Sequence, residues 1–134
     1  QPKRRSMAAL KKAGILEILN LRRHKNRDSK LSRPGRFNLH QVQLKASDIN
    51  EDSLMEALKI IRDRQGPILI HCWAGSDRTG LVCAMYRVIF DHWTKEQAIQ
   101  EMEGGGFGFH KRYHQVPDYI RQADIPRIRK MLSQ

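Results

Sequence analysis

The chain has 134 residues, of which 40% are hydrophobic and 29% are charged, and its formal net charge is +11. This length and apolar fraction predict one globular domain with its own core and exclude a second domain of ordinary size. No apolar stretch reaches the roughly 18 residues that a membrane-spanning helix needs, so the sequence predicts no membrane span.

The N-terminal part of the chain predicts a helix near 6–13, a strand over 15–21 and a basic loop over 22–36. The loop lacks periodic apolar residues, and Pro34-Gly35 is a turn signal. Residues 1–36 carry a net charge of +10, against +1 for the rest of the chain. Such a loop could steer anionic substrates, form a solvated surface or bind nucleic acid. Because no aromatic-rich recognition motif accompanies it, we expect steering or solvation rather than dedicated nucleic-acid binding.

The middle of the chain alternates strands and helices, which predicts an α/β architecture. In chain order we expect a strand over 38–44, an acidic loop over 45–50, a helix over 51–64, a strand over 67–71 and a helix over 79–91. Thr94 is predicted to cap a further helix that runs to about Met102 and ends at the glycines 104–106. The segment 113–132 is predicted to be helical, with Pro117 and Pro126 at helix starts or breaks.

A cysteine and an arginine six positions apart, Cys72 and Arg78, lie where a buried strand is predicted to meet a helix. The apolar run 67–70 precedes them and the apolar run 81–90 follows. A loop between a strand and a helix N-terminus directs backbone N–H groups into a concavity, and the helix dipole adds partial positive charge. The segment therefore predicts an anion site around a nucleophile.

Each residue type in this loop suits phosphate chemistry. The donors and the guanidinium should lower the pKa of Cys72 well below the free value of roughly 8.5, so that it is mainly thiolate. Arg78 offers a planar fork that binds two phosphoryl oxygens at once. Gly75 permits a tight loop. Thr79 can donate its hydroxyl to the Cys72 sulfur, and His71 is expected to fix the loop by hydrogen bonds rather than act as a base.

The residues 71–80 resemble the signature His-Cys-x5-Arg-Thr/Ser of the cysteine-dependent protein tyrosine and dual-specificity phosphatases. Gln1-Pro2, the segment 9–22 and the glycine-rich segment 104–110 are similar to the compact bacterial dual-specificity phosphatases, so the resemblance covers nearly the whole chain. The alternative for Cys72 is an inert buried cysteine.

The resemblance implies one catalytic domain over 1–134, with a central, mostly parallel sheet flanked by helices and with a leading strand trimmed away. It also implies that the phosphate is bound by the loop positions after the cysteine, namely Trp73, Ala74, Gly75, Ser76, Asp77 and Arg78.

The mechanism implied by the resemblance needs no metal or other cofactor. Cys72 attacks phosphorus, a carboxylic acid protonates the leaving oxygen, and water hydrolyses the cysteinyl-phosphate. Asp48, 24 residues before Cys72 in the acidic loop, is our choice for the acid. Asp52 is the rival, although its position favours a role at a helix start. Asn50 or Glu51 could cap the same helix.

Other features of the loop bear on the substrate. Asp77 precedes Arg78, and no lysine lies among the variable loop positions, which disfavours a highly phosphorylated substrate. Trp73 either lines the pocket mouth against an aromatic ring or fills space beside the loop.

The remaining cysteine and the histidines indicate no metal site. Cys83 is expected to pack in the core rather than form a disulfide with Cys72, and the histidines show no ligand spacing. His110 and His114 are one helical turn apart, which we interpret as a solvated face.

We therefore expect a phosphate monoester hydrolase acting on phosphotyrosine, and also on phosphoserine or phosphothreonine, in proteins. The alternatives are an inositol phosphate or phosphoinositide phosphatase, an RNA 5′-triphosphatase or, in another class, a phosphate-binding module without turnover. We expect a monomer. The resemblance to bacterial enzymes, some of them exported or periplasmic, implies an exported or periplasmic location, and the start at Gln1 fits a mature or trimmed form; a cytoplasmic location is the alternative.

Overall fold

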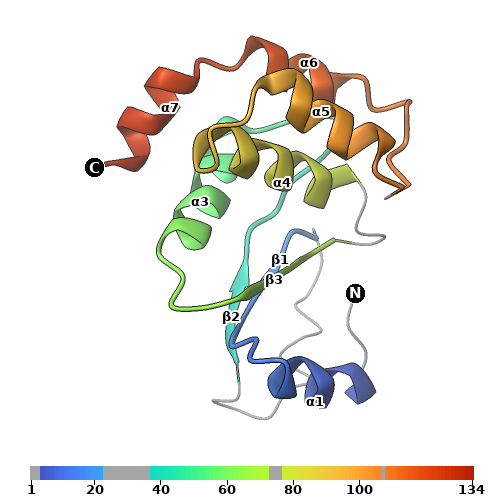
Figure 1. Ribbon diagram of the computed structural model, residues 1–134, viewed down its shortest axis with the longest axis vertical. Helices are drawn as coiled ribbons and strands as arrows, with labels where there is room; N and C mark the ends of the chain where they lie inside the picture. Colours follow the sequence, from blue (N-terminus) through green and yellow to red (C-terminus); the bar gives the residue numbers. More distant parts are fainter. Residues whose placement is uncertain (1–3, 23–36, 73–76, 107) are drawn as a thin grey trace.

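The structure is a computed structural model that describes residues 4–22, 37–72, 77–106 and 108–134. Its elements follow the alternating order predicted from the sequence (Figure 1). They are α1 (Arg4–Lys12), β1 (Glu17–Asn20), β2 (Asn38–Gln41), α3 (Glu51–Arg62), β3 (Ile68–His71), α4 (Asp77–Ile89), α5 (Lys95–Gly104), α6 (Gln115–Gln122) and α7 (Ile125–Leu132).

The three described strands form one parallel sheet in the order β2-β1-β3. Ile18 of the central strand is in register with Leu39 of β2 and with Leu69 of β3. Because all three strands run in the same direction, their carboxyl ends meet at one edge of the sheet. The predicted α/β class with a parallel central sheet is confirmed.

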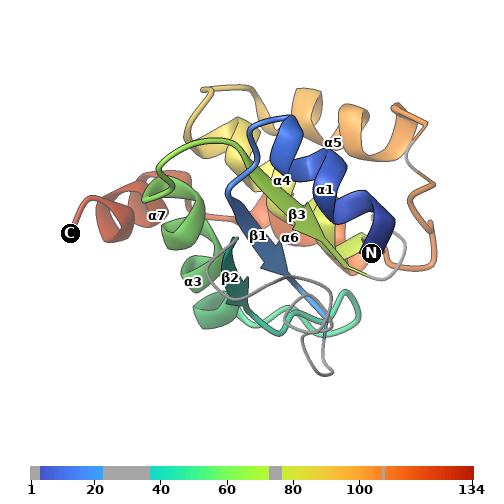
Figure 2. The ribbon, with the colours of Figure 1, turned by 90° about the horizontal axis from the view of Figure 1, so that it is seen from below.

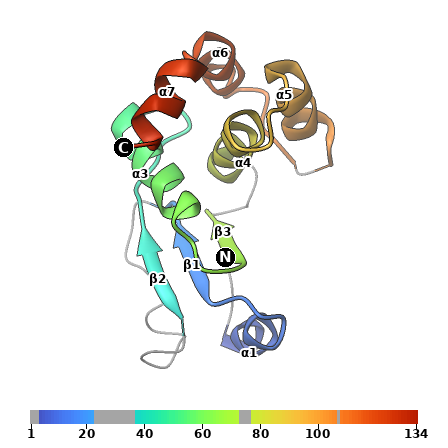
Figure 3. The same ribbon diagram turned by 60° about the vertical axis from the view of Figure 1, so that its left-hand side comes forward.

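Helices cover both faces of this sheet (Figure 3). On one face, Met7 and Leu10 of α1 pack against Ile18 and its register partners. The view from below shows α1 on this side (Figure 2). On the other face, Leu19 belongs to the larger core beneath α3 and α4. Successive strand residues thus serve opposite faces, as the twofold periodicity of a strand requires.

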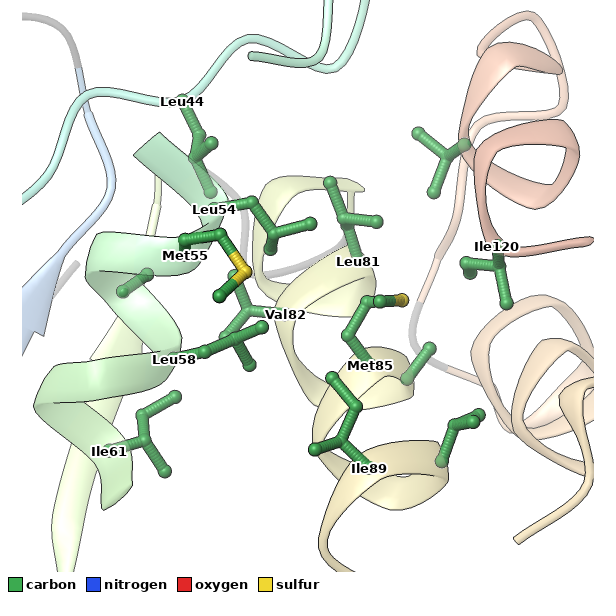
Figure 4. Close-up of a cluster of buried hydrophobic side chains, with 14 of the residues drawn as sticks. Leu44, Leu54, Met55, Leu58, Ile61, Leu81, Val82, Met85, Ile89 and Ile120 are labelled. Atoms are coloured by element: carbon green, nitrogen blue, oxygen red, sulfur yellow. The ribbon is translucent and has the colours of Figure 1, made fainter. Parts of the chain in front are cut away.

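The helix α4 lies at the centre of the larger core. It packs against β3, α3, α5, α6 and α7. Figure 4 shows Leu54, Leu58 and Ile61 of α3 facing Val82 and Met85 of α4. A helix surrounded in this way must be apolar on most sides, which is why the run 81–90 has little polar sequence.

Several boundaries have clear local causes. α1 ends in a Schellman motif, in which Gly14 has a φ of +87° while Gly14 N–H donates to Lys11 and Ile15 N–H donates to Leu10. α5 begins with the predicted cap, a capping box between Thr94 and Gln97.

Other boundaries differ from the prediction. The strands are shorter than expected, and α4 starts two residues early at Asp77 and ends at Ile89. At that end the Arg129 guanidinium donates to the carbonyl oxygens of Val88 and Ile89. The helical segment 113–132 is divided into α6 and α7, with Pro126 at the start of α7 as expected. The Asp124 carboxylate caps α7 by accepting from Arg127 N–H at 3.1 Å. Residues 23–36 of the predicted basic loop lie outside the described residues.

The α3–α4 contact generates a stability prediction. Leu58 is fully buried, so Leu58→Ala should lower the free energy of unfolding by about 2–5 kcal/mol through lost burial and a residual cavity. The exposed residue Glu56 of the same helix supplies the control, because Glu56→Ala should change the free energy of unfolding by no more than about 0.5 kcal/mol. Urea unfolding followed by circular dichroism measures both, and equal stability of the two variants would contradict the packing described.

Candidate active site

The candidate site lies at the carboxyl edge of the sheet, where β3 leads into α4. Asn20, at the end of β1, is in register with His71 at the end of β3. Leu21 N–H donates to the carbonyl oxygen of His71 at 2.8 Å, which extends the pairing to this edge. Cys72 follows directly, and α4 starts five residues later. Ligands of open parallel sheets bind outside this edge, which makes the junction the natural place for a site.

The Cys72 thiol contacts the first turn of α4. The Thr79 hydroxyl donates to Cys72 Sγ at 3.2 Å, and Cys72 is only 2% exposed. A hydrogen bond to sulfur favours the thiolate over the thiol. The contact brings together two residues seven positions apart that the sequence assigned to one site.

The predicted site residues differ in how far the structure describes them. His71 is 4% exposed, and its Nδ1 lies 3.5 Å from the carbonyl oxygen of Cys72, beside the loop backbone. Asp77 and Arg78 are the first two residues of α4, and both are half-buried. The other predicted phosphate-binding positions, Trp73, Ala74, Gly75 and Ser76, lie outside the described residues.

The Asp77 carboxylate binds a residue that the sequence analysis assigned to a solvated face. His110 donates its backbone N–H to Asp77 Oδ1 at 2.9 Å, and its Nδ1 lies 2.8 Å from Asp77 Oδ2. The expected helical spacing of His110 and His114 is wrong, because α6 begins only at Gln115. The two partners are 33 residues apart, and no local sequence signal connects them.

The segment that carries His110 packs closely on α4. A Cβ atom built on Gly80 would lie 3.1 Å from Met102 Cγ of α5 and 3.8 Å from the ring of Phe109. The glycine therefore permits α5 and the following segment to approach the turn that carries Arg78 and Thr79. A larger residue would displace Met102.

Asp48, the predicted acid, lies in the segment after β2 and is exposed. Its neighbours Ala46 and Ile49 pack on the core cluster that also contains Cys72. Because β2 and β3 are both parallel to β1, the segments that follow them leave the same edge of the sheet. The topology thus puts Asp48 and Cys72 at one end of the molecule.

The rival acidic residues are at the start of α3. Asn50 is the N-cap and accepts from Ser53 N–H at 3.1 Å. Glu51 accepts from Arg127 at 2.8 Å and from the Tyr119 hydroxyl at 3.4 Å, which joins α3 to α6 and α7. Asp52 is exposed in the first helical turn, where a carboxylate stabilises the helix dipole.

The two cysteines form no disulfide with each other and have different environments. Burial raises the pKa of the Cys83 thiol above its ordinary value, with a smaller contribution from Glu101. Cys83 therefore favours the neutral thiol, whereas Cys72 has a hydroxyl donor for its thiolate. Within the described ranges, no helix has the length and hydropathy to cross a bilayer, and no three His, Cys, Asp or Glu residues are grouped to hold a metal.

Comparison with known proteins agrees with this geometry. The sequence model of the tyrosine phosphatase family matches residues 37–101. The dual specificity protein phosphatase TpbA of Pseudomonas aeruginosa is 39% identical over 83 residues, which are 58% of this chain and 38% of TpbA. The match thus spans well under half the length of that relative.

Solved structures match over a larger part of the fold. The crystal structure of P. aeruginosa TpbA has a TM-score of 0.86 and 27% identity, and covers 100% of this chain and 83% of that one. A complex of TpbA with phosphotyrosine matches with the same TM-score and 26% identity. The catalytic core of the S. cerevisiae PP-IP phosphatase Siw14 shares the fold, with a TM-score of 0.82 at 23% identity. This match covers 99% of this chain and 83% of the Siw14 chain. The predicted family resemblance and fold are confirmed.

The Thr79 contact generates a prediction about thiol ionisation. Thr79→Val removes the donor and should raise the pKa of Cys72 by about one to two units, because hydrogen bonds to charged groups contribute about 1.5–3 kcal/mol. Alkylation of Cys72 by iodoacetamide should then begin at higher pH, as followed by mass spectrometry of the Cys72 peptide. Thr79→Ser keeps the hydroxyl and serves as the control. Identical pH profiles for Val and Ser would show that the hydroxyl does not act on the thiol.

Proposed function

We propose that this chain is a member of the cysteine-dependent tyrosine and dual-specificity phosphatase superfamily and that it hydrolyses phosphate monoesters through a cysteinyl-phosphate. The observation that carries the proposal is the hydrogen bond from Thr79 to Cys72 Sγ, made across a strand-to-helix junction whose first helical turn includes Arg78. A stabilised thiolate beside a guanidinium and a helix N-terminus is suited to attack phosphorus.

In the first step the Cys72 thiolate forms a bond to phosphorus while the bond from phosphorus to the ester oxygen breaks. Asp48 transfers its proton to that oxygen, so the leaving group departs as an alcohol or phenol. Arg78 stabilises the charge on the equatorial oxygens with its planar fork.

In the second step water attacks phosphorus and the thiolate leaves. Asp48, now a carboxylate, takes the proton from that water and is ready for another cycle. Thr79 assists both steps, because its hydroxyl stabilises the thiolate as nucleophile and as leaving group.

The proposed substrates are phosphotyrosine proteins, with phosphoserine and phosphothreonine as further candidates. Support comes from the phosphotyrosine complex of TpbA, whose fold this chain shares. Inositol phosphates are the second candidate, suggested by the Siw14 fold. The carboxylate of Asp77 beside Arg78 disfavours such a polyanion. RNA 5′-triphosphates and binding without turnover are the remaining alternatives.

Two substitutions test the nucleophile and the phosphate ligand. Cys72→Ser should lower kcat for an aryl phosphate by about 10⁴-fold or more while phosphate binding persists, because only the nucleophile is lost. Arg78→Lys should lower kcat/KM by about 10²-fold, since a point charge replaces a bidentate fork. Assays with chelator present exclude a contaminating metal phosphatase, and wild-type rates in either variant would remove the mechanism.

The acid is tested by the leaving group. Asp48→Asn should slow hydrolysis of an alkyl or phenyl phosphate by about 10²-fold or more, yet affect p-nitrophenyl phosphate much less, because a good leaving group needs little protonation. Asp52→Asn is the matched control and should behave like wild type with both esters. If the leaving-group effect appears in Asp52→Asn instead, the acid is Asp52.

A further inference from the structure

Asp77 presents an electrostatic problem for the proposed phosphate site. It is the first residue of α4, at the helix terminus whose free N–H groups and positive dipole attract an anion. A carboxylate in the first turn can accept from those same N–H groups, and it repels a phosphate dianion at short range. An unpartnered Asp77 side chain would therefore compete with the substrate for the site.

His110 engages both oxygens of that carboxylate. The backbone N–H of His110 donates to Oδ1 at 2.9 Å, and Nδ1 lies 2.8 Å from Oδ2. Because a carboxylate only accepts hydrogen bonds, Nδ1 must carry the proton in this contact. The Asp77 side chain is 15% exposed and the His110 side chain 50% exposed, so the pair is partly shielded and the imidazole borders solvent.

The position of His110 is fixed by its neighbours. Phe109 packs on the main core and approaches Gly80 in the first turns of α4. Tyr113 N–H donates to the carbonyl oxygen of His110 at 3.0 Å, and the Tyr113 ring lies edge-on to the imidazole with centroids 6.3 Å apart. The packing of Phe109 and the contacts with Tyr113 thus hold His110 at the start of α4.

The phosphate site is close to this pair. Asp77 lies two residues before Thr79, whose hydroxyl is 3.2 Å from Cys72 Sγ. Two residues of chain span at most about 7 Å between Cα atoms, so Asp77 belongs to the same helix terminus as Arg78 and Thr79. A carboxylate at that terminus adds negative charge to the field that attracts an anion. Whatever offsets that charge will affect an anion bound at Cys72.

We propose that His110 is a positioning residue for substrate binding that acts through Asp77. Its two hydrogen bonds hold the carboxylate away from the N–H groups of α4 and offset its negative charge, which leaves Arg78 and the helix terminus available to the phosphoryl group. The proposal rests on the proposed function, because it concerns the phosphate site of that function. It assigns His110 no contact with the reacting atoms.

The decisive experiment is a suppression test. His110→Ala should raise KM for an aryl phosphate and Kd for inorganic phosphate by roughly tenfold, with kcat changed much less, because it exposes the charge without touching the nucleophile. Adding Asp77→Asn to His110→Ala removes that charge and should return both constants close to their wild-type values. His110→Gln keeps a hydrogen-bond donor but cannot be protonated. Its KM and Kd should lie between those of the wild type and those of His110→Ala.

His114→Ala is the matched control, since His114 also lies near a carboxylate, Asp118 at 3.6 Å, but at the start of α6. It should leave KM and Kd unchanged. A merely structural role for His110 would lower stability and kcat, and Asp77→Asn would not rescue that loss.

Unchanged KM and Kd in His110→Ala, or a double variant no better than the single one, would overturn the proposal. A wild-type protein that binds phosphate but shows no turnover would contradict the proposed function alone. The Kd values of the variants for inorganic phosphate, measured by calorimetry, would still decide the role of His110. Absence of phosphate binding by the wild-type protein would overturn this proposal as well.

Discussion

The hydrogen bond from the Thr79 hydroxyl to Cys72 Sγ joins the end of β3 to the start of α4, and the account of this protein depends on it. Cys72, the proposed nucleophile, follows the end of a strand, whereas the proposed anion-binding groups belong to a helix terminus. Cys72 is 2% exposed, and burial by itself favours the neutral thiol, as it does for Cys83. In the proposed mechanism the Thr79 hydroxyl and the helix terminus stabilise the Cys72 thiolate against this effect of burial.

The rest of the fold holds that junction in place. α4 is enclosed by β3 and four helices, which fix its position relative to the sheet. The parallel order of the strands brings the segment after β2, with Asp48, to the edge where Cys72 lies. Gly80 lets α5 and Phe109 approach, and this approach places His110 against Asp77. Cys72 and His110 therefore meet at the start of α4, and Asp48 lies at the same edge of the sheet.

The sequence predicted the elements well because their signals are local. The apolar run before His71, the cap at Thr94 and the glycines after α5 each act within a few residues. It also placed Pro126 at a helix start, where the structure has it, but it did not identify Asp124 as the cap of that helix. The His110–Asp77 contact could not be predicted, because its partners are 33 residues apart and meet only through tertiary packing. The role of Asp48 stays a prediction, because an exposed acid acquires its function from a bound substrate.

The central claim is that phosphate passes through a covalent bond to Cys72. The most direct measurement is to mix the protein with an excess of aryl phosphate, quench in acid within the first turnovers and locate the added phosphate by peptide mass spectrometry. The account predicts a phosphate on the Cys72 peptide that is absent from Cys72→Ser and that accumulates further in Asp48→Asn, where hydrolysis of the intermediate lacks its base. Turnover without phosphate on Cys72, or with phosphate on another side chain, would contradict it.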